Sequence, residues 1–137
     1  MNNLLFENID NGKTTLLTNE NIKIQSVNYL RDIAELFGEN YLAYEVIDSD
    51  TNNDHTLDNN DILSLYLSND DGRGFQKLNK NNSNLIDYKT ISELNRLYFK
   101  SVSDSNKNGV FDKEDKVIYQ YIILDIENKI IEYTPSN

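Results

Sequence analysis

Two acidic segments of this chain share one pattern of oxygen-bearing side chains, and they stand 54 residues apart. The first segment covers residues 50–61 and the second covers residues 104–115. In both, Asp or Asn occupies positions 1, 3, 5, 9 and 12, and an apolar residue, Leu57 or Phe111, occupies position 8. Self-similarity at a fixed distance indicates a repeated structural unit. The sequence therefore predicts two copies of one unit, each built around an acidic loop.

The shared positions are those from which a twelve-residue loop can hold a calcium ion. Ca²⁺ takes roughly 6–8 oxygen ligands at about 2.3–2.6 Å, including a backbone carbonyl from position 7 of the loop. Position 6 requires a sharp bend, which Gly109 adopts freely and His55 adopts at some strain. The candidate calcium ligands are Asp50, Asn52, Asp54, Thr56, Asp58 and Asp61 in the first loop, and Asp104, Asn106, Asn108, Val110, Asp112 and Asp115 in the second.

Two other interpretations of these segments exist. Acidic, Asn-rich stretches are often surface turns capped by their own side chains, but two stretches in matching register favour a metal site. A frame for the first loop that begins at Asp48 puts His55 at the apolar anchor position, and we reject it for that reason. Asp48 is kept as a hydrogen-bond acceptor behind the metal ligands.

The residues that flank both loops alternate between apolar and polar types, which predicts antiparallel β-strands. Strand-like runs at residues 41–47 and 62–67 flank the first loop, and runs at 97–102 and 117–124 flank the second. Residues 22–27 and 85–91 supply the first strands of the two units, and Asn11-Gly12 marks an N-terminal hairpin. Roughly ten strands are expected. The apolar spacing from Tyr29 to Phe37 predicts one short helix that ends at Gly38.

We therefore expect one all-β domain over residues 1–137, because a chain of this length builds a single core. Its parts are a hairpin over residues 4–18, a first repeat over 22–78 and a second repeat over 85–134. Tyrosines on the strands, namely Tyr41, Tyr44, Tyr66, Tyr98, Tyr119 and Tyr121, are expected in the core and in cross-strand pairs more than in a sugar-stacking surface.

Composition and charge limit the classes of partner and of metal site that this chain can have. The chain carries 23 acidic against 13 basic residues, a net charge of -10, which disfavours nucleic acid and anionic membranes and favours a divalent cation. It has no Cys and one His, which excludes thiolate and multi-histidine metal sites. No apolar stretch is long enough to span a bilayer, and no signal peptide is visible at the N-terminus. The abundance of Asn, Lys and Ile suggests a bacterial source.

The two loops resemble the EF-hand calcium loop, and more closely its dockerin variant, which ends in Asp. In those families a helix leaves the loop, whereas residues 62–68 and 116–123 have strand periodicity. The strand–loop–strand setting is more similar to the calcium hairpins of integrin-type propeller repeats. Residues 64–72 and 75–78 also resemble a blade of the periplasmic Tol-type β-propellers. The resemblance implies antiparallel hairpin repeats forming about two and a half propeller-like blades, either as an open sheet stack or as a ring completed by a second copy.

The expected function is that of a calcium-binding, calcium-stabilised structural or interaction module without catalytic activity. Two Ca²⁺ ions are the expected cofactors, and the partners are calcium and either another protein or a second copy of the chain, with no nucleic acid and no membrane insertion. The expected location is periplasmic, cell-surface or secreted, where calcium is abundant. The alternatives are a dockerin-like module that binds a cohesin-like partner, and a carbohydrate-binding or carbohydrate-active protein.

Overall fold

The computed structural model describes residues 5–7, 14–17, 22–48, 61–80, 83–103, 116–124 and 128–135. These residues form a mostly β structure with one short α-helix, which confirms the predicted antiparallel β class. The strands are β1 (Leu5–Glu7), β2 (Thr14–Leu16), β3 (Lys23–Tyr29), β4 (Tyr41–Ile47), β5 (Ser64–Asn69), β6 (Gln76–Lys77), β7 (Ser83–Ile91), β8 (Arg96–Ser103), β9 (Lys116–Ile123) and β10 (Ile130–Tyr133). The helices are α1 (Arg31–Phe37) and the 3₁₀ turn η1 (Ser92–Leu94). No described helix is long and apolar enough to cross a membrane.

The strands are arranged in three antiparallel sheets. β1 and β2 pair as the predicted N-terminal hairpin. The first large sheet has the order β3-β4-β5-β6, and the second has the order β7-β8-β9-β10. In both large sheets each strand pairs with the next one in the sequence, so both are simple four-stranded meanders.

The two large sheets also share their irregular features. The first strand pair of each sheet has a register shift, between Ile24 and Ser26 in one and between Leu85 and Asp87 in the other. A short helix, α1 or η1, then connects the first strand to the second. Each helix ends on a residue in the left-handed conformation, Gly38 at φ 70° and Asn95 at φ 53°. The two halves are therefore built alike in detail as well as in strand order.

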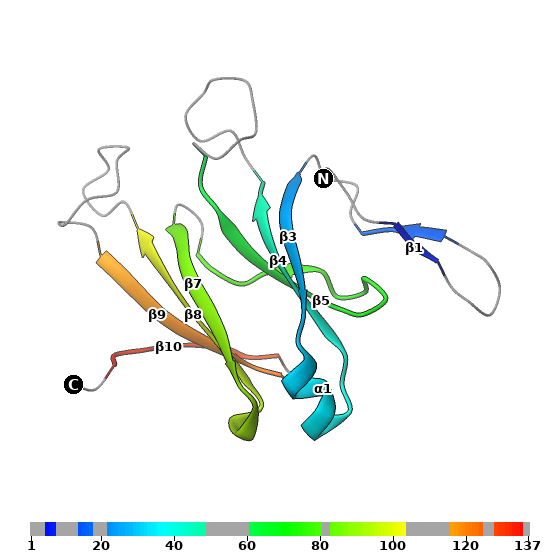
Figure 1. Ribbon diagram of the computed structural model, residues 1–137. Coiled ribbons are helices and arrows are strands. Elements are labelled where there is room, and N and C mark those ends of the chain that lie inside the picture. The colour runs from blue at the N-terminus through cyan, green and yellow to red at the C-terminus, as the bar shows by residue number, and fades with distance from the viewer. Residues whose placement is uncertain are drawn as a thin grey trace.

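The predicted helix is present as α1 and ends at Gly38, whose left-handed backbone favours glycine. Leu30 and Ile33 pack into the core. Phe37 belongs to the same apolar spacing but is 44% exposed. The reason is that α1 lies at one end of the first sheet (Figure 1), so only its N-terminal half reaches the core.

Two apolar clusters lie on opposite faces of the first sheet. One cluster joins the two large sheets face to face, through residues of β4, β5, β7, β8 and β9. The other cluster covers the far face of the first sheet with Leu17, Ile22 and Phe75. Because both of its faces are covered, β5 is buried from Ser64 to Ser68, whereas β8 alternates between buried and partly exposed residues. The first sheet therefore has the second sheet on one face and Leu17, Ile22 and Phe75 on the other.

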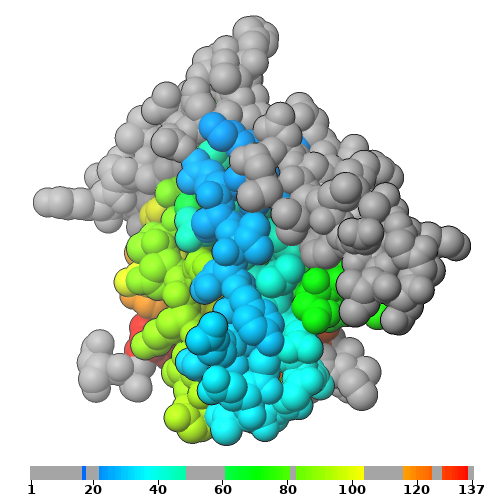
Figure 2. Space-filling model, turned by 45° about the vertical axis from the view of Figure 1, so that its right-hand side comes forward, coloured from blue at the N-terminus to red at the C-terminus, as the bar shows by residue number. Residues whose placement is uncertain are grey.

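The first strands of the two sheets run along the same side of the molecule. Figure 2 shows β3 in blue beside β7 in yellow-green, with α1 in cyan below them. Side chains from both strands, including Asn28, Tyr88 and Lys89, line a pocket of about 320 Å³ between them.

Candidate metal centres

Both predicted calcium loops connect the second and third strands of a sheet. The first loop lies between β4 and β5, whose last paired residues on that side are Val46 and Ser64. The second lies between β8 and β9, where Ser103 pairs with Lys116. The strand ends that lead into the two loops lie at the same end of the molecule, opposite α1 and η1 (Figure 1). The prediction that strands, and not helices, leave both loops is confirmed.

The pair formed by Ser103 and Lys116 encloses the second candidate loop, residues 104–115. Directly opposed residues of an antiparallel pair have Cα atoms about 4.5–5.5 Å apart. Twelve extended residues would span roughly 40 Å. The chain therefore leaves and rejoins the sheet at nearly one point, with enough length between to wrap around an ion.

Of the twelve candidate ligands, only Asp61 lies in the described part of the chain. Asp61 is 6% exposed and stands three residues before β5. The other candidates lie outside the described residues: Asp50, Asn52, Asp54, Thr56, Asp58, Asp104, Asn106, Asn108, Val110, Asp112 and Asp115. Within the described ranges no three His, Asp or Glu side chains gather closely enough to hold a metal ion.

The chain that enters the first loop is held by Asp48, two residues before Asp50. Asp48 Oδ2 accepts a hydrogen bond of 2.6 Å from the Tyr66 hydroxyl of β5. Lys77 Nζ of β6 lies 3.2 Å from the same oxygen. Asp48 therefore ties the chain just before the loop to two strands of its own sheet, and its expected role behind the metal ligands stays a prediction.

The chain that leaves the first loop is tied to the second sheet. The Leu63 N–H donates to Asn84 Oδ1 at 2.8 Å, and the Leu85 N–H donates to the Leu63 carbonyl at 2.8 Å. Both partners belong to β7. The chain that follows the first loop is therefore bonded to the first strand of the second sheet.

A buried amide strengthens the same junction. Asn79 Oδ1 accepts from the Leu65 N–H at 2.9 Å, and Asn79 Nδ2 donates to the carbonyl and the hydroxyl of Ser83 at 3.1 Å. Asn79 and Ser83 are both buried. Sequence reasoning missed Asn79 and Asn84, because nothing in a single sequence distinguishes a buried Asn from the many Asn residues expected in turns.

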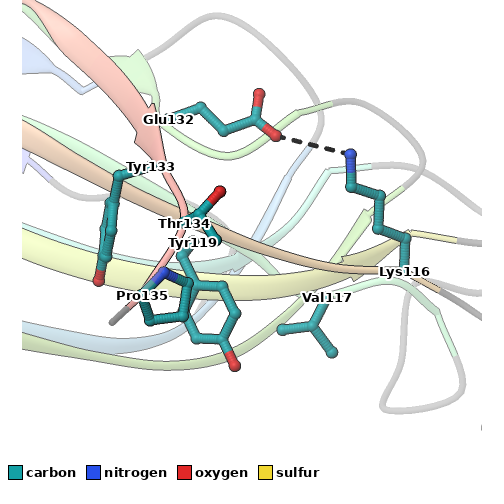
Figure 3. A pocket seen from close by; sticks show the side chains of 7 residues that line it. All are labelled: Lys116, Val117, Tyr119, Glu132, Tyr133, Thr134 and Pro135. Carbon is teal, nitrogen blue, oxygen red and sulfur yellow. Dashed lines mark ion pairs between the residues drawn. The ribbon is translucent and has the colours of Figure 1, made fainter. Parts of the chain in front are cut away.

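The exit of the second loop is bordered by an ion-pair cluster. Figure 3 shows Lys116 Nζ pointing at Glu132, whose Oε1 lies 4.0 Å away. Lys80 Nζ lies 2.7 Å from Glu132 Oε2. The hydrogen bond from Lys80 holds the pKa of the Glu132 carboxyl below its usual range, and the charges of Lys80 and Lys116 act in the same direction. With Tyr119 and Tyr133, Lys116 and Glu132 line a pocket of about 460 Å³.

The tyrosines divide between two environments. Tyr41, Tyr44 and Tyr66 are buried, which confirms their expected place in the core. Four more contact one another on the far face of the second sheet, and we call this set the tyrosine face: Tyr98, Tyr119, Tyr121 and Tyr133. Of the remaining two, Tyr29 is exposed and Tyr88 packs against the core between the sheets. The ring centroids of Tyr98 and Tyr121 are 5.1 Å apart. The Arg96 guanidinium carbon lies 4.3 Å from the centroid of the Tyr121 ring. Cross-strand pairing was expected, but the part of Tyr133 and Arg96 in this face was not.

Comparison of the chain with protein-family models, with curated proteins and with solved structures found no match. Its function is therefore inferred from its residues and their arrangement.

Proposed function

We propose that this protein binds two calcium ions, one in each of the loops 50–61 and 104–115, and that calcium stabilises it as a non-enzymatic structural or interaction module. The observation that carries the proposal is the pairing of Ser103 with Lys116 on either side of the second loop. Positions 1 and 12 of such a loop contact the same ion at about 2.3–2.6 Å, so the two ends must lie close together. The β8–β9 ladder supports this requirement for Asp104 and Asp115.

The first loop has matching support from its anchors. Its start is held through Asp48 by β5 and β6, and its exit is held through Leu63 by β7. Fixed ends reduce the conformational entropy that the loop loses when it closes around an ion. The first loop has four candidate carboxylate ligands within twelve residues, and a divalent cation relieves the repulsion among them.

We further propose that each four-stranded sheet with its loop is a propeller-like blade, and that the N-terminal hairpin is half of a third. The common strand order, the common register shift and the face-to-face packing of the two sheets support this interpretation. About two and a half blades are too few for a closed ring, so the arrangement is either an open stack or a ring that needs further copies.

The alternative functions have less support. In a dockerin a helix follows each calcium loop, whereas β5 and β9 follow the loops in this chain. A sugar-binding surface needs a free aromatic ring face, and the Arg96 guanidinium lies over the ring of Tyr121. The proposed location is periplasmic, cell-surface or secreted, because calcium sites of modest affinity fill only where the ion is abundant.

Thermal unfolding in calcium, in magnesium and in chelator tests the proposed function. An ion that binds only the folded chain adds about 2.7 kcal/mol per site at a hundredfold excess over Kd, so two sites should raise Tm by on the order of 10 °C. Magnesium should raise Tm far less, because it demands a tight octahedron and keeps its water.

Three variants make this experiment specific to the loops. Asp50→Ala and Asp104→Ala should each remove about half of the calcium-dependent rise in Tm. Asp87→Ala is the matched control, since Asp87 is an exposed carboxylate on β7, outside both loops. Equal melting curves in calcium and in chelator for the wild-type chain would overturn the proposal.

A further inference from the structure

A pocket of about 320 Å³ lies at the junction of the two large sheets, where residues of β3, of the start of α1 and of β7 come together. β3 and β7 run side by side in this region, with α1 below them (Figure 2). Ligand pockets typically have volumes of about 300–1,000 Å³ and often lie between structural units. This pocket therefore has the position of a ligand site and room for a small molecule.

The uncharged part of the pocket is apolar, and its two sides are joined to each other. Leu30 belongs to the apolar cluster between the sheets, and Tyr88 packs against that cluster. The Tyr88 hydroxyl of β7 is hydrogen bonded to the side chain of Asn28 on β3. Burial raises the pKa of the Tyr88 phenol, because the phenol is partly withdrawn from water. The pocket thus offers an aromatic ring and an aliphatic side chain that are already in place.

Charged side chains of both signs line the same pocket. Arg31 and Lys89 are cations, Asp32 is a carboxylate, and all three are exposed. None of the three forms an ion pair with another described residue. The charge of Glu45 also acts on the Tyr88 phenol, so a further carboxylate lies nearby. The charges around the pocket are therefore balanced, and those of Arg31, Asp32 and Lys89 are available to a ligand.

We propose that this pocket binds a small zwitterion with an apolar side group, of the kind of a free α-amino acid. The carboxylate of the ligand lies toward Arg31 and Lys89, its ammonium group toward Asp32, and its side group against Tyr88 and Leu30. Charge-assisted hydrogen bonds of this kind, above all from a guanidinium to a carboxylate, are about twice as strong as neutral ones.

The mixed charges of the lining exclude simpler ligands. An anion alone would bring a like charge to Asp32, and a cation alone would bring like charges to Arg31 and Lys89. A molecule that carries both charges avoids both penalties. The inference uses no residue of the two candidate calcium loops, so it stands independently of the proposed calcium binding.

Titration with L-phenylalanine, followed by NMR through the shifts of the backbone amides, tests the site. L-phenylalanine carries both charges and an aromatic ring, whereas 3-phenylpropionate lacks the ammonium group and phenethylamine lacks the carboxylate. We expect L-phenylalanine to shift the amides of residues 28–32 and 88–90 with a Kd on the order of 1 mM. Each of the two compounds with a single charge should bind at least about tenfold more weakly.

Two variants remove one charge each and nearly keep the size of the side chain. Asp32→Asn and Lys89→Gln should each weaken the binding of L-phenylalanine at least about fivefold. Glu35→Gln is the matched control, because Glu35 is an exposed carboxylate of α1 that does not line the pocket. The amide spectrum of each variant shows whether it is folded, so a loss of binding is not confused with a loss of structure.

Unchanged amide shifts at L-phenylalanine concentrations far above the expected Kd would overturn the proposal. If 3-phenylpropionate binds as tightly as L-phenylalanine, the pocket takes an anion, and if phenethylamine does, the pocket takes a cation. Either result would contradict a site for a zwitterion. An equal loss of affinity in Glu35→Gln and in Asp32→Asn would also overturn the proposal, because it would reflect the net charge of the protein and not the pocket.

Discussion

The Tyr44 hydroxyl is hydrogen bonded to Ser68 Oγ inside the core, where it joins β4 to β5. Ser68 Oγ also donates to the Asn69 carbonyl at 2.8 Å. The titratable phenol of Tyr44 therefore lies between the first sheet and the residues Leu17, Ile22 and Phe75 that cover it. Burial raises the pKa of the Tyr44 phenol, and the hydrogen bond with Ser68 lowers it by less.

Stability at alkaline pH should depend on Tyr44. A pKa that is higher in the folded state than in the unfolded state, where it is about 10, means that the folded chain holds this proton more tightly. The contribution of Tyr44 to the free energy of unfolding is fully present below about pH 10, and it is lost as the pH rises through the pKa of Tyr44 in the folded state. In urea unfolding, the free energy of unfolding of the wild-type chain should therefore fall above about pH 10. For Tyr44→Phe it should fall less steeply with pH. Tyr88 and Tyr133, whose pKa values burial also raises, should keep part of the slope.

The matched control for this measurement is Tyr29→Phe. The Tyr29 hydroxyl donates to Asn40 Oδ1 at the surface, at 2.6 Å. Because this substitution removes a tyrosine hydroxyl at the surface, we expect its urea unfolding curve at neutral pH to stay close to that of the wild-type chain. A Tyr44→Phe variant with the wild-type slope would show that Tyr44 does not set the alkaline limit.

Removing the Asn79 side chain should destabilise the junction of the two sheets. Asn79→Ala leaves the Leu65 N–H and the Ser83 carbonyl without the amide that now pairs with them. Each buried polar group left unpaired costs about 1–3 kcal/mol, so we expect a loss of about 2–4 kcal/mol in the free energy of unfolding. Asn40→Ala, which removes an amide at the surface, should change it by less than about 0.5 kcal/mol. Equal unfolding curves for the two variants would show that water replaces the Asn79 amide.

The two calcium loops should differ in affinity. The first loop has four candidate carboxylate ligands, at Asp50, Asp54, Asp58 and Asp61, and the second has three, at Asp104, Asp112 and Asp115. The extra charge favours the first loop, whereas a non-glycine residue such as His55 at the bend costs on the order of 1 kcal/mol. An added carboxylate at about 2.4 Å from a divalent ion should outweigh this strain.

Calorimetric titration of variants checks this order of affinities. Asp50→Ala should remove the tighter of two binding phases and leave the second nearly unchanged. His55→Gly should tighten the first site by relieving the bend. If Asp104→Ala removes the tighter phase instead, backbone strain dominates over ligand charge.

Alternation of apolar residues was enough to predict the strands, because each central strand of the second sheet has one buried face. Leu97 and Phe99 point into the core, and Tyr98 between them points away. The same alternation cannot distinguish Tyr44 from Tyr98, since the difference between them lies in which layer covers the sheet. The cover of the first sheet consists of Leu17, Ile22 and Phe75, which lie outside β4 and β5, so it forms only when the complete fold brings them together.

The hydrogen bonds of Asn79 and Asn84 at the junction of the two sheets could not be predicted, for a related reason. Asn79 bonds to Leu65, fourteen residues away, and Asn84 bonds to Leu63, twenty-one residues away. A side chain forms such bonds only after both sheets are in place, so no local pattern encodes them. The loop spacing, in contrast, is a local signal. The alternation of apolar residues is local as well, and it predicted the positions at which β4, β8 and β9 begin or end to within a few residues.

The number of calcium ions bound per chain tests the central proposal most directly. Isothermal titration of the metal-free protein with CaCl₂ should give two ions per chain, and titration with MgCl₂ under the same conditions should give little heat. The double variant Asp50→Ala with Asp104→Ala should bind no calcium, whereas the control Asp87→Ala should still bind two ions. A stoichiometry near zero for the wild-type chain, or two ions bound by the double variant, would contradict the assignment of calcium to these loops.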